Sequence, residues 1–203
     1  KRVRFVTDYT LQPIPGKTLS RRLPEGTALV LEGGGLRGYY SCGVMEAFME
    51  KDLLFPYIIG VSAGAANALS YISGQPGRSR EIIEHYVGNP DYVSTRNLLT
   101  KHTMFDFDYI FGTVPEKHIF FDWDKFHEQD TRFLTGAMNC ADGKTVWFEK
   151  DTLKAPFMAS RASCSVPLIT KIQHYMGYDL LDGGISDPIP IEKSLADGNT
   201  FHV

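Results

Sequence analysis

The sequence lacks several features that define common structural classes. It has only three cysteines in 203 residues, an odd number without zinc-site spacing, which points to free thiols in a reducing compartment. No stretch approaches the roughly 18 consecutive apolar residues of a transmembrane helix. Internal repeats and low-complexity tracts are also missing. We therefore expect neither a disulfide scaffold, nor a transmembrane segment, nor a repeat protein.

The sequence also lacks a large excess of charge of either sign. Twenty-one basic and 24 acidic residues give a net charge of −3, which offers no argument for a nucleic-acid partner. Residues 1–26 nevertheless form a basic N-terminal extension, whose basic side chains are Lys1, Arg2, Arg4, Lys17, Arg21 and Arg22. Such an extension is either solvated or in contact with an anionic membrane surface, and it lacks the apolar segment of a secretory signal. We expect a cytoplasmic protein and leave peripheral membrane contact open.

Apolar patterning in the first seventy residues indicates an α/β domain. Apolar runs at residues 27–32 and 55–60 predict buried strands, and helical patterns at residues 36–51 and 62–69 follow them. This alternation over short links implies a parallel sheet with right-handed crossovers. The length and an apolar fraction of 43% suit one compact domain, which we place at residues 27–203.

The second half continues the sheet. We predict a hairpin over residues 132–149 with its turn at Asp142-Gly143, a helix over residues 152–162 and a strand over residues 178–181. The chain does not begin with Met, and residues 200–203 resemble the start of another strand. We therefore expect a fragment that is truncated at its C-terminus.

An aromatic-rich segment interrupts this pattern. Residues 86–133 hold 11 of the 25 aromatic side chains, among charges and prolines, and predict an irregular helical insertion. The aromatics either pack inward as a satellite core or stay partly exposed along a substrate cleft. The candidates for the cleft are Phe105, Phe107, Phe111 and Phe121.

Residues 60–64 form a G-x-S-x-G pattern between a predicted strand and a predicted helix. A serine on such a sharp turn is exposed at the end of the sheet, beside a helix N-terminus that stabilises negative charge. Gly60 and Gly64 fit because the turn brings the residues on either side of the serine together. The pattern also fits a tight turn with an incidental serine, but its context favours Ser62 as a nucleophile.

A second glycine cluster, residues 33–38 (GGGLRG), follows the first predicted strand. The N–H groups of such a loop bind a phosphate or the oxyanion of a tetrahedral intermediate. The loop also matches the G-x-G-x-x-G dinucleotide pattern, which expects an acidic residue after the next strand, where this chain has the serine turn. Arg37 supports the loop, contacts a substrate phosphate or pairs with a helix acid. The predicted oxyanion-hole residues are Gly33, Gly34, Gly35, Arg37 and Gly38.

Asp182-Gly183-Gly184 follows the last predicted strand. Ligands of open α/β sheets bind beyond the carboxyl ends of the strands, where all three motifs fall. A carboxylate there accepts the hydroxyl proton of Ser62 as a general base. An aspartate before glycine is, by itself, more often a turn residue that caps its own backbone. With the other two motifs present, we predict that Asp182 is catalytic.

Together these motifs resemble the patatin-like phospholipase family, whose members carry G-G-G-x-[KR]-G, G-x-S-x-G and D-G-[GA] in this order. A softer family feature, A-S-x-x-x-P, matches residues 162–167. The resemblance covers about residues 27–203 and looks closest to bacterial stand-alone members. It implies a three-layer α/β sandwich with a central, mostly parallel sheet. It also implies a Ser62–Asp182 dyad without a catalytic histidine, an acyl-enzyme, and no metal or cofactor.

We therefore expect a serine acyl hydrolase whose partner is a lipid or other acyl-ester substrate of the phospholipid or lysophospholipid type. Three alternatives stay open. The order of Ser62, Asp182 and His202 is that of a conventional Ser-Asp-His esterase. A catalytically silent lipid-binding module and a nucleotide-binding protein are the others. A cysteine nucleophile is disfavoured, because no cysteine lies on a comparable turn.

Overall fold

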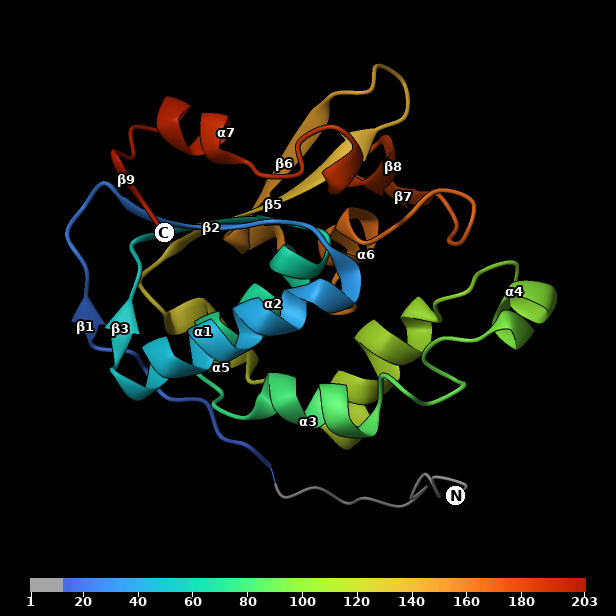
Figure 1. Ribbon diagram of the computed structural model, residues 1–203, viewed down its shortest axis with the longest axis horizontal. Helices are drawn as coiled ribbons and strands as arrows, with labels where there is room; N and C mark the ends of the chain where they lie inside the picture. The colour runs from blue at the N-terminus through green and yellow to red at the C-terminus, as the bar shows by residue number, and fades with distance from the viewer. Residues whose placement is uncertain (1–12) are drawn as a thin grey trace.

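The protein is described by a computed structural model that covers residues 13–203. These residues form a sheet of seven strands in the order β7-β8-β5-β4-β2-β9, with β6 paired to β5 (Figure 1). The strands are β2 (Thr27–Leu31), β4 (Tyr57–Val61), β5 (Arg132–Asn139), β6 (Thr145–Glu149), β7 (Gln173–Tyr175), β8 (Tyr178–Asp182) and β9 (Phe201–His202).

Four neighbouring strands, β5, β4, β2 and β9, run parallel. β6 and β8 pair with β5 in the antiparallel direction, and β7 pairs with β8 in the same way. The predicted parallel strands and the hairpin at Asp142-Gly143 are thereby confirmed. The predicted strand opening at residues 200–203 corresponds to β9.

Helices lie on both faces of the sheet (Figure 1). The larger layer comprises α1 (Tyr39–Glu50), α2 (Ala63–Ile72), α3 (Arg78–His85), α5 (Trp123–Glu128) and α6 (Met158–Ser163), and the opposite face carries α7 (Ile191–Ala196). Alternate residues of β2 face the two layers: Leu29 and Leu31 join the main core, whereas Ala28 and Val30 join a smaller cluster on the other side. The three-layer α/β arrangement expected from the motifs is confirmed.

Part of the predicted N-terminal extension packs against this domain. β1 (Arg21–Arg22) pairs in parallel with β3 (Leu53–Leu54), and Leu19 is buried in the main core. Lys17 donates a hydrogen bond from Nζ to the carbonyl oxygen of Met49. The basic residues Lys1, Arg2 and Arg4 lie outside the described residues.

The aromatic-rich segment is helical and irregular. It contains α4 (Thr95–Lys101), a π-helix, η2 (Tyr109–His118), and α5. Phe121 and Phe126 are fully buried. Phe121 packs edge to face against Trp123 and Phe157, and Phe126 packs edge to face against Trp123. This half of the segment therefore forms core.

One predicted element is wrong in part. The helix expected over residues 152–162 begins only at Met158, after a short 3₁₀ turn, η3 (Lys150–Thr152). Pro156 explains the difference, because proline has no N–H to donate and its ring keeps the preceding residue out of helical conformation. The spacing of apolar residues alone does not predict that the helix begins after Pro156.

Candidate active site

Ser62 lies on a sharp turn between β4 and α2. Its φ of 51° and ψ of −129° are unusual for a residue other than glycine, and it directly follows Val61, the last residue of β4. α2 begins at the next residue, so its positive N-terminal end lies directly beside the Ser62 hydroxyl. This is the strand–turn–helix geometry that the G-x-S-x-G pattern predicts.

The glycines on either side of Ser62 are required by close backbone contacts. A Cβ atom at Gly60 would lie 2.8 Å from the backbone nitrogen of Ala65, and one at Gly64 would lie 2.6 Å from the carbonyl oxygens of Leu31 and Glu32. Backbone atoms cannot move aside as a flexible side chain can. Any larger residue at either position would therefore distort the turn that presents Ser62.

Asp182 reaches Ser62 because two strands end at the same point of β5. Val61 of β4 pairs with Gly136, and Asp182 of β8 pairs with the next residue, Ala137. Since β6 pairs with both Gly136 and Ala137, β4 and β8 share the opposite edge of β5. β4 runs parallel and β8 antiparallel to β5, so their carboxyl ends meet head to head.

Ser62 and Asp182 are in direct contact at this junction. The Ser62 Oγ donates a hydrogen bond to Asp182 Oδ2 over 2.7 Å, and Oδ1 accepts a hydrogen bond from the N–H of Gly184 over 2.8 Å. Burial raises the pKa of Asp182, while the hydrogen bonds from Ser62 and Gly184 act in the opposite direction. A carboxylate with raised proton affinity beside a hydroxyl is suited to act as a base.

Ser163 connects the turn that carries Ser62 to strand β5 through two hydrogen bonds. Its Oγ accepts a hydrogen bond from the Ser62 N–H over 2.7 Å and donates one to the carbonyl oxygen of Gly136 over 2.5 Å. The side chain is fully buried at the end of α6. The sequence marked Ser163 only as part of A-S-x-x-x-P, and no spacing in the chain indicates that it ties the serine turn to β5.

The glycine loop lies against the serine turn. A Cβ at Gly33 would lie 3.2 Å from the Cβ of Ser62. The N–H groups of Gly33 and Arg37 are already used, since they donate to the carbonyl oxygens of Pro188 and Gly34. Among residues 13–203, no hydrogen bond takes up the N–H groups of Gly34 and Gly35, so these two best fit the role predicted for the loop.

The other predicted loop residues have different surroundings. The side chain of Arg37 is exposed and lies over Gly34. Gly38 is buried, and its carbonyl oxygen accepts a hydrogen bond from Nδ2 of Asn67 over 3.1 Å. Gly38 therefore anchors the loop to α2.

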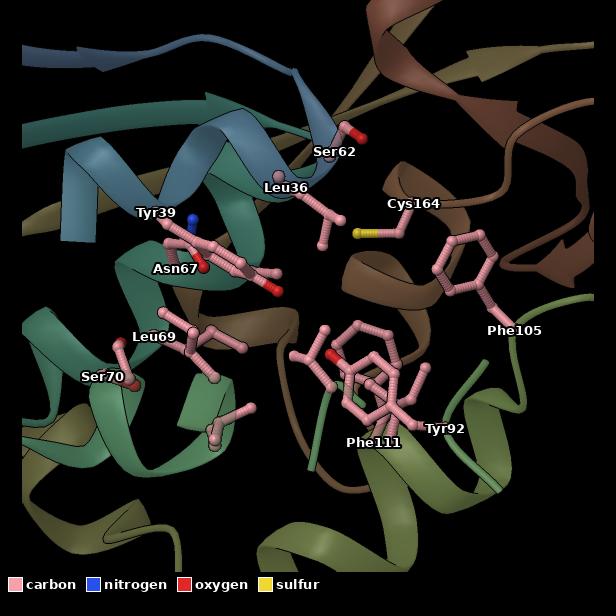
Figure 2. Close-up of a pocket in the computed structure, with 18 of the residues that line it drawn as sticks. Leu36, Tyr39, Ser62, Asn67, Leu69, Ser70, Tyr92, Phe105, Phe111 and Cys164 are labelled. Atoms are coloured by element: carbon pink, nitrogen blue, oxygen red, sulfur yellow. The ribbon is translucent and has the colours of Figure 1, made fainter. Parts of the chain in front are cut away.

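A largely apolar cavity of about 200 Å³ opens beside Ser62. Figure 2 shows Leu36 and Tyr39 along one side, Phe111 and Tyr92 facing them, and the sulfur of Cys164 pointing inward. The aromatic-rich segment supplies Phe105, Phe107 and Phe111 to its wall, whereas Phe121 is not among the lining residues.

No histidine or cysteine side chain within residues 13–203 forms a hydrogen bond with the side chain of Ser62 or Asp182. None of the histidines, all of which lie within residues 13–203, is a hydrogen-bond partner of either residue. His202 contacts Ser194 and lies on β9, which pairs with the beginning of β2, at the other end of the parallel strands. Burial raises the pKa of the Cys164 thiol well above its usual value, which keeps it protonated. Within residues 13–203 no group of three histidine, cysteine or acidic side chains is arranged to hold a metal ion.

Comparison with known proteins identifies the family. The model of the patatin-like phospholipase family matches residues 29–194. This chain therefore belongs to the patatin-like phospholipase family.

Two proteins of similar sequence are longer than this chain. It is 29% identical to "Uncharacterized protein YjjU" of Escherichia coli (strain K12), covering 93% of this chain and 54% of that protein. It is 27% identical to "Uncharacterized NTE family protein Rv1063c" of Mycobacterium tuberculosis (strain ATCC 25618 / H37Rv), over 81% of this chain and 44% of the relative. The chain thus spans about half the length of these relatives.

A solved structure shares the fold. VipD from Legionella pneumophila matches with a TM-score of 0.53 and 16% identity, over 88% of this chain and 51% of VipD. At this identity the likeness concerns the fold alone. It agrees with the α/β layers described above.

Proposed function

We propose that the protein is a serine acyl hydrolase that cleaves carboxylic esters of lipids through Ser62 and Asp182. Membership of the patatin-like phospholipase family supports lipid hydrolase activity in general. The observation that carries the specific proposal is the 2.7 Å hydrogen bond from Ser62 Oγ to Asp182, on a strained turn that opens into an apolar cavity.

The proposed reaction proceeds through an acyl-enzyme. Ser62 Oγ attacks the ester carbonyl carbon, and its proton passes to Asp182. The N–H groups of Gly34 and Gly35 stabilise the oxyanion, and each donor of this kind contributes about 3–4 kcal/mol to the transition state. The ester C–O bond then breaks, and the leaving alkoxide takes the proton from Asp182. In the second half, Asp182 accepts a proton from water, whose oxygen attacks the acyl carbon. The bond between this carbon and Ser62 Oγ then breaks, and Asp182 returns the proton to Oγ, which releases the free acid and restores Ser62.

Lipid substrates are supported by the cavity and its mouth. The cavity lining is largely apolar, and each methylene buried there stabilises a bound acyl chain by about 0.8 kcal/mol. Leu36 and Val166 line the cavity and are also exposed, and Leu168 nearby in the sequence is almost fully exposed. Apolar side chains at the mouth suit peripheral contact with a lipid surface. Among residues 13–203, no helix combines the length and the apolar character needed to span a bilayer.

The test is labelling with a fluorophosphonate, followed by peptide mapping of the adduct. We expect the adduct on Ser62, and we expect Ser62→Ala to abolish hydrolysis of a short p-nitrophenyl ester. Labelling at another residue, or full activity of Ser62→Ala, would contradict the proposal. Since the chain spans about half of its relatives, the assay uses the full-length protein.

The same assay separates the alternatives. A silent lipid-binding module binds lipid vesicles but neither reacts with the probe nor turns over esters. A conventional esterase loses activity in His202→Ala as completely as in Ser62→Ala. A nucleotide-binding protein gains thermal stability with nucleotide, because a ligand that binds only the folded state stabilises it.

A further inference from the structure

The wall of the cavity beside Ser62 contains a buried arginine without an acidic partner. Arg78, the first residue of α3, is 5% exposed and lines the cavity. Its guanidinium donates to the Oγ of Ser70 over 3.0 Å and to the carbonyl oxygen of Ile119 over 3.5 Å, and lies 5.0 Å from the ring centre of Phe121. Its Nε has no hydrogen-bond partner among residues 13–203, and no carboxylate there forms an ion pair with it.

This environment leaves a positive charge uncompensated. A guanidinium has five N–H donors, and Arg78 has two neutral acceptors, one of them at the limit of hydrogen-bond distance. Burial lowers the pKa of Arg78 to about 10, so the side chain is still a cation at neutral pH. A buried, unpaired charge is costly, and an incoming anion with good geometry removes much of that cost.

Arg78 contacts the C-terminal part of α2, whereas Ser62 lies at the N-terminal end of this helix. Its partner Ser70 is eight residues beyond Ser62 along α2, which corresponds to about 12 Å at the helical rise of 1.5 Å per residue. Ser62 and Arg78 both line the same cavity. The nucleophile and the buried cation are therefore separated by roughly the length of a medium-chain acyl group.

Other hydrogen-bond donors surround this part of the cavity, and acids are missing from it. In Figure 2 the hydroxyl groups of Tyr39 and Tyr92 point toward the interior of the cavity, and Ser70 also lines the cavity. Arg78 and Tyr92 are close enough for each to shift the pKa of the other, and burial raises the pKa of both tyrosines, so both hydroxyls are protonated donors at neutral pH. Among the lining residues there is one cation and no aspartate or glutamate.

We propose that this cavity accepts acyl chains that end in a carboxylate, and that Arg78 binds this distal carboxylate while Ser62 attacks the ester at the other end. The proposal deepens the proposed function and rests on it. The substrate class is an ester of a medium-chain dicarboxylic acid, whose methylenes contact the apolar wall between the two ends. Arg78 is then a determinant of specificity and does not touch the reacting atoms.

The test compares two p-nitrophenyl esters of equal chain length, the octanoate and the hydrogen suberate. We expect a higher kcat/KM for the suberate in the wild type. Arg78→Met should lower the suberate-to-octanoate ratio of kcat/KM about ten- to a hundredfold, the range for a hydrogen bond to a charged group. Arg80→Met is the matched control, since Arg80 lies on the same helix and is exposed, and it should leave the ratio unchanged. Partial unfolding affects both esters equally, so the ratio is insensitive to it.

Several outcomes overturn the proposal. A wild-type preference for the octanoate does so even if Arg78→Met fails to fold, and so does an equal ratio in wild type and Arg78→Met. A third outcome also rejects the substrate class. If free octanoate inhibits the wild type competitively, Arg78→Met abolishes this inhibition, and the suberate-to-octanoate ratio of kcat/KM is unchanged, then Arg78 binds the carboxylate of a free fatty acid and not the distal carboxylate of a substrate.

A binding measurement separates this proposal from the proposed function. Calorimetric titration of Ser62→Ala protein with azelate should show binding that the Ser62→Ala, Arg78→Met protein lacks. If no ester is hydrolysed and no probe labels Ser62, the hydrolase proposal fails, yet Arg78-dependent azelate binding still supports the carboxylate site. Hydrolysis of the octanoate without azelate binding rejects the carboxylate site alone.

Discussion

Val61 and Asp182 lie 121 positions apart in the sequence but pair with adjacent residues, Gly136 and Ala137, on one edge of β5. β4 and β8 approach this point from opposite directions, and each ends there. The residue after Val61 is Ser62, so the proposed nucleophile and its carboxylate partner meet across the gap between the two strands. Two rigid strand ends thereby hold the pair in contact.

Replacing Asp182 should remove most activity. Asp182→Asn keeps the shape of the side chain but cannot accept the Ser62 proton, and general-base groups typically contribute 10²–10⁴-fold. We expect kcat to fall within about this range, measured with a p-nitrophenyl ester. Asp179→Asn, an exposed position on the same strand, is the matched control and should retain full activity. Activity of Asp182→Asn close to the wild type is incompatible with the dyad.

The pH profile should reflect the raised pKa of Asp182. In the proposed mechanism the ionised carboxylate is the active form, so kcat/KM should fall as the pH drops through a pKa above the usual 3.8. The folded state also favours the protonated carboxyl, so ionisation of Asp182 destabilises the protein at neutral pH, and this penalty disappears on acidification. Asp182→Asn should accordingly unfold at a higher temperature than the wild type at pH 7, with a smaller difference at acidic pH. An acid limb at or below the ordinary value argues against Asp182 as the base.

Ser163→Ala should impair both the turn and catalysis. The substitution leaves the Ser62 N–H and the Gly136 carbonyl without their partner, which costs about 1–3 kcal/mol of the free energy of unfolding. We expect kcat to fall with little change in KM, because the proposed nucleophile Ser62 loses its position while the cavity is untouched.

Ser160→Ala is a matched control for this experiment. Ser160 is equally buried on α6, but its hydroxyl has no hydrogen-bond partner within residues 13–203. Its loss should leave kcat unchanged and stability equal or slightly higher. If the two variants behave alike, Ser163 acts only as core.

Aromatic residues of the 86–133 segment should divide into two groups. Phe107 is half-buried and lines the cavity, so Phe107→Ala should change the preference for acyl-chain length with a small fall in melting temperature. Phe126 is fully buried in the core away from the cavity, so Phe126→Ala should cost about 3–5 kcal/mol of stability without altering that preference. Kinetics over a series of p-nitrophenyl esters, together with thermal melts, distinguishes the two effects. Unchanged preference in Phe107→Ala rejects the cleft role.

Much of the site was predictable because its motifs are local. The elbow glycines and the glycine loop depend on contacts between residues close to a strand end, and each has its own sequence pattern. Ser163 had no such pattern: its role depends on where α6 packs, 101 residues after Ser62. The burial of Arg78 could not be predicted either, since an arginine in an amphipathic stretch predicts an exposed charge. In the structure Arg78 is buried at the start of α3 and lines the cavity.

The class of fold, the serine turn and the candidate partner Asp182 follow from local sequence patterns, since each is encoded by apolar periodicity or by glycines next to one polar residue. The tertiary structure alone decided that β8 meets β4 end to end, that Ser163 holds the turn, and which phenylalanines face the cavity rather than the core. It also decided that residues 13–26 pack against the domain. These outcomes depend on strand order and helix packing, which arise from contacts between residues far apart in the chain and leave no local pattern.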